Sequence, residues 1–316
     1  MSFLIFALGL VTLVAGGEFF IKGSSRMAAL FGMPPLLIGL TVVSFGTSAP
    51  ELGVSVQAAL DGYASIALGN VTGSNIFNVL GVLGLSALAA PLLIHTNLVK
   101  FDVPVMIFVS LLLGTMAYDG DINRVEGSFL FLSAIVYTWV LIMGAQKEKK
   151  KDLQEGAEEF KTQKDIKSVF LMLFFMALGL LGLVVGARWT VDSAIEIAKA
   201  FSVSERVIAV TIVAVGTSLP ELVTSVMASL RGERDLAVGN VVGSNIYNIL
   251  IILGLSAVIS PTGVQVEKAS LMTDIPIVIA VAALCFPFFK RQTMQRWVGA
   301  LFVLLYVVYV LYLLQN

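Results

Sequence analysis

The chain has 316 residues, of which 58% are hydrophobic and only 13% are charged. A soluble domain carries about twice that share of charged residues, so the composition excludes an ordinary soluble protein and indicates a helical membrane protein. The net charge of −1 gives no indication of a nucleic-acid partner. The single cysteine excludes a disulfide framework, and one histidine with one cysteine cannot make a zinc site.

Ten apolar segments of about the length that crosses a bilayer as a helix follow one another along the chain. The first is interpreted as a membrane helix, because it lacks the basic start of a signal peptide and has a counterpart in the middle of the chain. The ten segments leave no soluble domain. We expect helices at Phe3–Ile21, Leu36–Leu60, Ser65–Ala89, Val103–Tyr118, Val125–Gly144, Val169–Arg188, Val207–Leu230, Leu236–Ile259, Leu271–Phe289 and Val298–Leu314.

The two halves of the chain repeat one another at an offset of 170 residues. Gly69–Ile76 matches Gly239–Ile246 at seven of eight positions, and Gly-Leu-Ser-Ala recurs at 84–87 and 254–257. Each copy holds five predicted helices, and because five is odd, the second copy enters the membrane from the opposite face. The predicted fold is an all-α polytopic membrane protein with ten transmembrane helices. They form two inverted five-helix repeats with broken helices at the midplane, as is typical of secondary transporters.

A charged linker separates the two repeats. We expect the first repeat at residues 1–145, the linker at 146–167 and the second repeat at 168–316. The linker lacks the Asp, Asn and Gly spacing of an EF-hand, so it is interpreted as a solvated connection rather than a calcium sensor. Connections on its side of the membrane contain 15 Lys and Arg residues, against 5 on the other side. The positive-inside rule predicts a cytoplasmic linker and both termini outside, in the cell (inner) membrane.

The motif Gly-Thr-Ser-x-Pro-Glu occurs twice, at Gly46–Glu51 and Gly216–Glu221, each time inside a long apolar segment. A charge at that depth costs about 2.5–3.5 kcal/mol on insertion scales, so each glutamate is a candidate functional group. The proline before it has no N–H to donate and frees the carbonyl four residues back. Such carbonyls persist only where they face protein or a water-filled cavity. Carboxylates, hydroxyls and free carbonyls together suit hard cations such as Ca²⁺ and Na⁺.

More polar side chains accompany each glutamate at helical spacing. Thr47 and Ser48 are expected on the same helix face as Glu51, and Ser74 and Asn78 on one face of the next helix. If the repeats face each other, two carboxylates, several hydroxyls and two amide oxygens converge. The second repeat supplies the equivalent residues Thr217, Ser218, Glu221, Ser244 and Asn248.

Other polar residues receive a structural interpretation. Asn75 and Asn245 are expected to tie the broken helices together. Asn70 and Asn240 are expected to cap helix starts or loops. Asp102 and Asp274 are expected to stabilise helix N-termini. Ser55 and Ser86 are expected to hold neighbouring helices together. Glu18 lies near a helix end, and Arg188 stands at its repeat position.

The doubled Gly-Thr-Ser-x-Pro-Glu and Gly-Ser-Asn-Ile-x-Asn motifs resemble the two alpha-repeats of the calcium/cation antiporter superfamily. The nearest likeness is to its prokaryotic sodium/calcium exchangers, and the resemblance covers nearly the whole chain. It implies exchange of Ca²⁺ for Na⁺ by alternating access, without a cofactor. The sliding helix pair of the family would correspond to the first and sixth helices. We expect the chain to lie in the lipid bilayer and to function as a monomer.

The resemblance also implies roles for individual residues. Glu51 and Glu221 would be the central ligands for both ions. Ser44 and Ala214 would offer backbone carbonyls at flanking sodium sites, and Asn78 would lie on the midline. Many sodium/calcium exchangers carry Asp where this chain has Asn248, so a possible third carboxylate is missing here. Hydroxyl or other oxygens would come from Thr47, Thr217, Ser48, Ser218, Ser74 and Ser244.

Three other functions are weighed against this one. A proton-coupled cation antiporter could use the same fold, and the missing carboxylate leaves the coupling ion open. A passive cation channel could use an acidic ring, but an inverted repeat with broken helices favours alternating access. An intramembrane hydrolase is disfavoured, because Ser48 and Ser218 have no His or Lys base at comparable depth.

Overall fold

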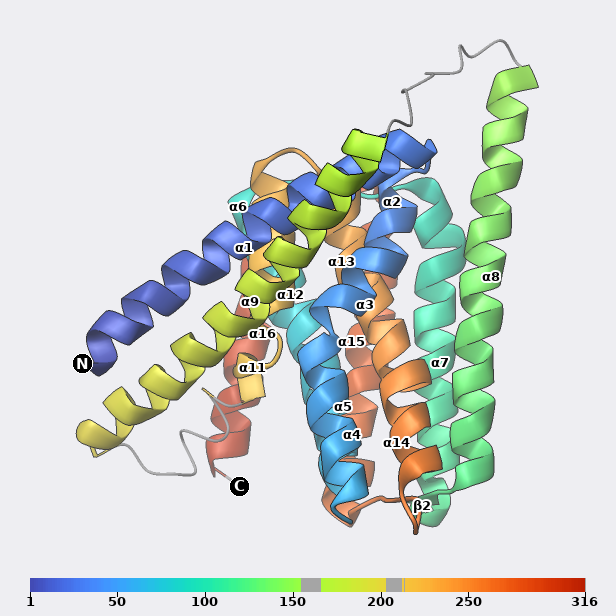
Figure 1. Cartoon of the computed structure of the whole chain (residues 1–316). Helices are drawn as coiled ribbons and strands as arrows, with labels where there is room; N and C mark the ends of the chain where they lie inside the picture. Colours follow the sequence, from blue (N-terminus) through green and yellow to red (C-terminus); the bar gives the residue numbers. More distant parts are fainter. Residues whose placement is uncertain (155–165, 203–211, 213, 316) are drawn as a thin grey trace.

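The computed structural model describes residues 1–154, 166–202, 212 and 214–315. Most helices run alongside one another, whereas α1 (Ser2–Phe31) and α9 (Ile166–Ala200) lie together at an angle across one flank of the bundle (Figure 1). Within the described residues, eight helices are long and apolar enough to cross a membrane, and one bent pair makes a ninth candidate. The chain is a multi-pass helical membrane protein. The predicted helix Val207–Leu230 lies partly outside the described residues, so the number ten stays a prediction.

The elements of the two halves recur at the offset seen in the sequence. Helix α12 (Leu219–Leu230) begins and ends 170 residues after α4 (Ala49–Leu60), and α14 (Gly254–Ile259) begins and ends 170 residues after α6 (Gly84–Ala89). The remaining helices of the first half are α2 (Pro35–Ile38), α3 (Ser44–Thr47), α4 (Ala49–Leu60), α5 (Ser65–Phe77), α6 (Gly84–Ala89), α7 (Val103–Met116) and α8 (Arg124–Gln154). Those of the second half are α11 (Ala214–Gly216), α12 (Leu219–Leu230), α13 (Arg234–Tyr247), α14 (Gly254–Ile259), α15 (Ile275–Phe289) and α16 (Arg296–Gln315).

Several helices contain wider π-helical turns, which in proteins occur mostly as short bulges near functional sites. Two of them are repeat equivalents that begin at Asn78 and Asn248. A short 3₁₀ turn, η4 (Ala117–Asp119), follows α7. The π segments are η1 (Gly39–Val43), η2 (Asn78–Leu83), η3 (Leu98–Asp102), η6 (Asn248–Leu253) and η7 (Ser270–Asp274).

Helices α1 and α9 extend about ten residues beyond their predicted ends, Ile21 and Arg188. The residues that follow include Lys, Arg, Met and Ala in α1 and Ala, Glu and Lys in α9. These have good helix propensity, so each helix continues past its apolar run. Helix α1 stops only at Gly32, whose φ of 58° places it in the left-handed region that favours glycine. The expected ends were wrong because apolarity alone defined them.

Glycines line the contact between α1 and α9. A Cβ added at Gly182 would lie 2.9 Å from the Cα atom of Gly16, so the two backbones touch. Small residues commonly allow such close approach between membrane helices. These helices are the first and sixth, the pair that the family resemblance singles out. The glycines are Gly9, Gly16 and Gly23 on α1, with Gly179, Gly182 and Gly186 on α9.

Two short antiparallel ladders join the halves of the chain. Strand β1 (Leu92–Leu93) pairs with β4 (Thr293–Met294), and β2 (Asp121–Ile122) pairs with β3 (Val264–Gln265). Helix α7 runs between β1 and β2, so the ladders lie at opposite ends of the bundle. Each ladder therefore fastens the first half to the second at one end.

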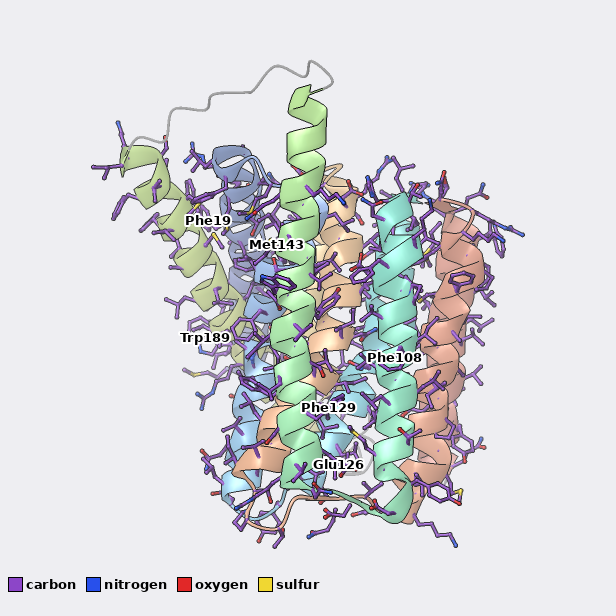
Figure 2. The ribbon with its side chains drawn as sticks, turned by 90° about the vertical axis from the view of Figure 1, so that its right-hand side faces the viewer. Phe19, Phe108, Glu126, Phe129, Met143 and Trp189 are labelled. Carbon is purple, nitrogen blue, oxygen red and sulfur yellow. The ribbon has the colours of Figure 1, made fainter. Side chains whose placement is uncertain are left out.

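Large apolar side chains cover the outside of the bundle. Phe108, Phe129 and Trp189 project away from α7, α8 and α9 (Figure 2) and are 63%, 53% and 43% exposed. Apolar surface of this extent belongs against lipid, since soluble proteins rarely expose it. Glu126 lies instead at the start of α8, where its carboxylate accepts the N–H of Asn123 at 2.9 Å in a capping box.

Candidate functional site

A helix break places one glutamate of each half in the interior. The first half bends by 47° between α3 and α4, at Ser48, which confirms the predicted broken helix there. Ser218 has a similar backbone, with φ of −90° and ψ of 11°. Pro50 and Pro220 follow in the first helical turn, where a missing N–H costs nothing. Each glutamate thus begins a helix, where the dipole favours negative charge.

Each glutamate accepts a hydrogen bond from the other half of the chain. Glu51 is 1% exposed and Glu221 is 0% exposed. Ser48 Oγ donates to Glu221 Oε1 at 2.8 Å, and Ser218 Oγ donates to Glu51 Oε1 at the same distance. The expectation that Ser48 faces Glu51 on one helix surface was therefore wrong. The helix ends at Ser48, and this redirects its hydroxyl to the other half.

Two more serines extend this arrangement from α5 and α13. Ser244 Oγ lies 3.2 Å from Ser48 Oγ, and Ser74 Oγ lies 3.1 Å from Ser218 Oγ. Ser48 and Ser218 have one hydroxyl proton each and can donate it to a glutamate. Ser74 and Ser244 are then the donors in the serine–serine bonds, which leaves their lone pairs available. The structure brings all four predicted serines together.

Two asparagines hold the threonines of the motif in place. Thr47 Oγ1 donates to Asn240 Oδ1 at 3.0 Å, and Thr217 Oγ1 lies 3.4 Å from Asn70 Oδ1. Thr47 Oγ1 also bonds to the carbonyl of Val43 in its own helix, at 3.1 Å. Each threonine thus touches the opposite half, as each serine does.

Asn70 and Asn240 correct an expectation, because they lie inside α5 and α13 and cap no helix. Asn70 Nδ2 donates to the backbone carbonyl of Glu51 and to Ser55 Oγ, at 3.2 and 2.9 Å. Asn240 Nδ2 donates to Ser225 Oγ at 2.9 Å. Ser55 does join two helices, as expected. Recurrence of both asparagines beside a glycine at the 170-residue offset was the signal that could have revealed this role.

Asparagines also connect the two halves. Asn75 Nδ2 donates to the backbone carbonyl of Asn245 at 3.1 Å, which confirms the predicted tie between the broken helices. Asn248 Nδ2 donates to Asn75 Oδ1 at 3.0 Å. Asn78 is completely buried, at the start of η2, and both of its amide atoms lack a hydrogen-bond partner.

Several buried oxygens have no hydrogen-bond partner among the described residues. They include Glu51 Oε2, Glu221 Oε2 and Asn248 Oδ1. Buried polar atoms in proteins are almost always satisfied, so this group of acceptors calls for a cationic ligand. In the part of the chain that the structure describes, neither glutamate pairs with a Lys, Arg or His side chain. The donor set is entirely oxygen, which fits Ca²⁺ or Na⁺ better than a transition metal.

The backbone carbonyls of Ser44 and Ala214 were predicted as ion ligands. The carbonyl of Ser44 already accepts a bond from the N–H of Ser48 at 3.0 Å, and Thr47 Oγ1 lies 3.3 Å from it. Ala214 is the first residue of α11, and its side chain lies outside the described residues.

Asp102 and Asp274 stand at the starts of α7 and α15, as expected, although neither side chain makes a capping hydrogen bond. Asp102 is 3% exposed and accepts a 2.9 Å bond from the hydroxyl of Tyr137 on α8. Asp274 has side-chain contacts with Ser270 and with Tyr309 on α16. A tyrosine from a neighbouring helix therefore contacts each aspartate.

Known proteins share this architecture. A family model described as sodium/calcium exchanger protein matches residues 1–143 and 171–315. Inner membrane protein YrbG of Escherichia coli K12 is 35% identical over 93% of this chain and 90% of its own length. Sodium/calcium exchanger MaX1 of Methanosarcina acetivorans is 34% identical over 99% and 98%. The solved structure of the sodium-calcium exchanger NCX_Mj, soaked with 2.5 mM Na⁺ and 0.1 mM Ca²⁺, superposes with a TM-score of 0.83. It is 32% identical, over 97% of this chain and 96% of that one.

Proposed function

Because this chain belongs to the sodium/calcium exchanger protein family, we propose that it exchanges Ca²⁺ for Na⁺ across the cell membrane by alternating access. Membership makes it a cation antiporter rather than an enzyme, and we propose Na⁺ as the coupling ion. One observation carries the proposal. Each buried glutamate uses one oxygen for a serine of the opposite half and leaves the other oxygen without a partner.

Ca²⁺ binds between the two glutamates in this proposal. Ca²⁺ takes six to eight oxygen ligands at roughly 2.3–2.6 Å, more than the two carboxylates supply. The amide oxygens of Asn78 and Asn248 and the nearby hydroxyls complete the set. Na⁺ ions occupy the same oxygens and those beside them when Ca²⁺ leaves. The proposed hydroxyl and carbonyl ligands are Ser44, Thr47, Ser48, Ser74, Ala214, Thr217, Ser218 and Ser244.

In this proposal, the transport cycle depends on two inverted repeats, residues 1–145 and 168–316. The 170-residue offset of α4 and α12, and the ladders at opposite ends of the bundle, support the inversion. The excess of Lys and Arg on one side supports a cytoplasmic linker at 146–167 and external termini. Each half completes the site of the other, so the exchanger works as a monomer.

Proton coupling is the second candidate, and Asn248 favours it. Without a third carboxylate the site holds two negative charges, which one Ca²⁺ neutralises and two protons could also neutralise. A passive channel fits less well, because Glu51 and Glu221 are sealed from solvent in this structure. A hydrolase lacks a base beside Ser48 and Ser218, which instead donate to the glutamates.

Uptake of ⁴⁵Ca²⁺ into proteoliposomes distinguishes these functions. An outward Na⁺ gradient without a pH gradient should drive uptake, and an outward K⁺ gradient should not. Uptake driven only by a pH gradient would replace Na⁺ coupling with proton coupling. Uptake that needs no counter-ion would identify a channel.

A further inference from the structure

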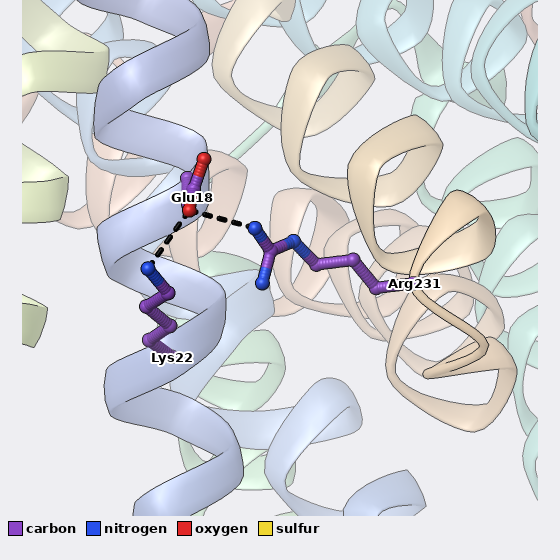
Figure 3. A network of polar contacts seen from close by, with 3 residues as sticks. All are labelled: Glu18, Lys22 and Arg231. Atoms are coloured by element: carbon purple, nitrogen blue, oxygen red, sulfur yellow. Dashed lines mark ion pairs between the residues drawn. The ribbon is translucent and has the colours of Figure 1, made fainter.

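An ion-pair cluster joins α1 to the end of α12. Glu18 Oε1 lies 2.8 Å from Lys22 Nζ, one turn further along α1, and 2.7 Å from Arg231 Nη2 (Figure 3). Arg231 directly follows the last residue of α12. We call the Glu18–Arg231 pair the first clasp, because it holds the two helices together at one end of the bundle.

The repeat offset maps every member of this cluster onto a residue of opposite charge. Adding 170 to Glu18 gives Arg188, and adding 170 to Lys22 gives Asp192. Subtracting 170 from Arg231 gives Asp61, at the end of α4. Because the signs are reversed at all three positions, the same pairwise attractions are encoded in the second copy.

Only part of the second cluster is formed in this structure. Arg188 Nε lies 3.7 Å from Asp192 Oδ2, which repeats the pair within α1. Asp61 instead accepts bonds from Gln57 Nε2, at 3.0 Å to each carboxylate oxygen. Among the described residues, Arg188 and Asp61 form no ion pair with each other, and the Arg188 side chain is 82% exposed.

Packing between the helices shows the same asymmetry. At Gly17 of α1, an added Cβ would lie 2.9 Å from a methyl group of Val223 on α12. The repeat equivalents of these residues are Ala187 of α9 and Gly53 of α4. A Cβ added at Gly53 would meet no atom within 4 Å. Helix α1 is therefore packed onto α12, whereas the matching face of α4 is uncovered.

Three hydroxyls on the helices that the first clasp joins are buried without a hydrogen-bond partner among the described residues. They are the hydroxyls of Ser24, Thr224 and Ser229. Burying an unpaired hydroxyl costs free energy. Apolar residues occupy the equivalent positions, namely Ala194, Val54 and Ala59. The helices of the first clasp therefore carry a cost of burial that the equivalent positions of the second half do not carry.

We propose that Arg188 and Asp61 form a second clasp, between α9 and α4, when the first clasp opens. The two pairs then act as alternating gate residues at opposite ends of the exchanger, an inference that rests on the alternating access proposed above. Exposed ion pairs are weak, and each shifts a conformational ratio by up to about fivefold. Weak clasps suit a carrier, because each has to open once per cycle.

Cross-linking of paired cysteines tests the second clasp in a Cys285→Ser background, which removes the single native thiol. One variant carries Asp61→Cys with Arg188→Cys, and its matched control carries Glu18→Cys with Arg231→Cys. Long ion-paired side chains span more than a disulfide allows, so a short cleavable bis-thiol reagent is used. We expect both pairs to cross-link, each to stop transport, and cleavage to restore it. A variant with all four cysteines should never carry both links in one molecule.

Absence of the 61–188 link under every mixture of Na⁺ and Ca²⁺ would overturn the second clasp, as would both links in one molecule.

Reversal of the charges at positions 188 and 61 gives an independent measure. Arg188→Glu should slow exchange about two- to fivefold, and adding Asp61→Arg should restore it. The control Glu126→Gln, in the capping box of α8, should leave exchange unchanged, and failure of Asp61→Arg to rescue would also count against the clasp. Cross-linking does not depend on the coupling ion, so Na⁺-independent uptake would refute the proposed function and leave this result standing.

Discussion

Ser48 Oγ donates a 2.8 Å hydrogen bond to the carboxylate of Glu221, which lies 173 residues further along the chain. Ser218 makes the same bond to Glu51 in the opposite direction. Neither half therefore contains a complete site, because each carboxylate is oriented by a hydroxyl from the other half. Any movement of one half against the other would act directly on the oxygens that we propose as ion ligands.

The first prediction concerns the two glutamates. Glu51→Gln or Glu221→Gln should reduce apparent Ca²⁺ affinity by about 100-fold or more, since removing one partner of a buried charge pair costs about 3–5 kcal/mol. Glutamine keeps the shape, so the protein should still insert and fold. Glu126→Gln, in the capping box of α8, serves as a control with normal Na⁺-driven ⁴⁵Ca²⁺ uptake. Near-normal uptake by either folded site variant would refute the assignment.

The second prediction concerns the serines that cross between the halves. Ser48→Ala should weaken Ca²⁺ binding by roughly 10–150-fold, because a hydrogen bond to a charged group contributes about 1.5–3 kcal/mol. In double-mutant cycles, Ser48→Ala should couple to Glu221→Gln more strongly than to Glu51→Gln. Ser110→Ala is the control, since that hydroxyl bonds only within its own helix in the described contacts. Stronger coupling of Ser48 to Glu51 would contradict the cross-bonded geometry.

The sequence predicted the helix breaks and both glutamates, because a proline interrupts a helix and a carboxylate in an apolar segment costs free energy unless a ligand offsets it. It failed for Ser48, whose direction depends on where the helix ends and on how the halves dock. It failed for Asn70 because a polar residue near a predicted helix start satisfies a local capping rule. The bond from Thr217 to Asn70 joins residues 147 positions apart, and no local pattern encodes such a contact.

A third prediction addresses Asn240, which links Thr47 to Ser225. Asn240→Ala leaves buried donors and acceptors unpaired, which should lower stability by about 1–3 kcal/mol and reduce Ca²⁺ binding. Thermal unfolding in detergent, with and without Ca²⁺, measures both effects. Gln57→Ala on the exposed face of α4 is the comparison and should change neither. An unchanged midpoint for Asn240→Ala would show that these bonds contribute little.

Membrane orientation gives the fourth prediction. Leu93 in β1 and Tyr118 in η4 are 51% and 80% exposed, at opposite ends of the bundle. In a Cys285→Ser background, an impermeant thiol reagent added to intact cells should label Tyr118→Cys and leave Leu93→Cys unlabelled. Inverted membrane vesicles should give the reverse pattern. Labelling of Leu93→Cys in intact cells would reverse the proposed topology.

The last prediction concerns Asn248, whose Nδ2 atom donates to Asn75 Oδ1 while its Oδ1 atom has no partner. Asn248→Asp removes that donor. An ionised carboxylate would then face the Asn75 oxygen, which repels it, whereas a protonated carboxyl could donate to that oxygen and keep the contact. Asn75 cannot readily turn its amide to help, because its Nδ2 atom is already bonded to the carbonyl of Asn245.

Ca²⁺ reverses this preference, because a third carboxylate close to the ion adds an attractive charge. Ca²⁺ binding to Asn248→Asp should therefore release a proton, which wild type cannot release from this position. We expect the pH dependence of Na⁺-driven Ca²⁺ flux in Asn248→Asp to differ from that of wild type between about pH 6 and about pH 8. At the upper end, Ca²⁺ should bind to the variant roughly tenfold more tightly. Asn78→Asp is the matched comparison. The amide of Asn78 has no hydrogen-bond partner, so the pH dependence of Ca²⁺ flux in Asn78→Asp should differ from that in Asn248→Asp. Identical pH profiles for wild type and Asn248→Asp would remove Asn248 from the ion site, because a carboxyl group in contact with the ion has to respond to the ion's charge.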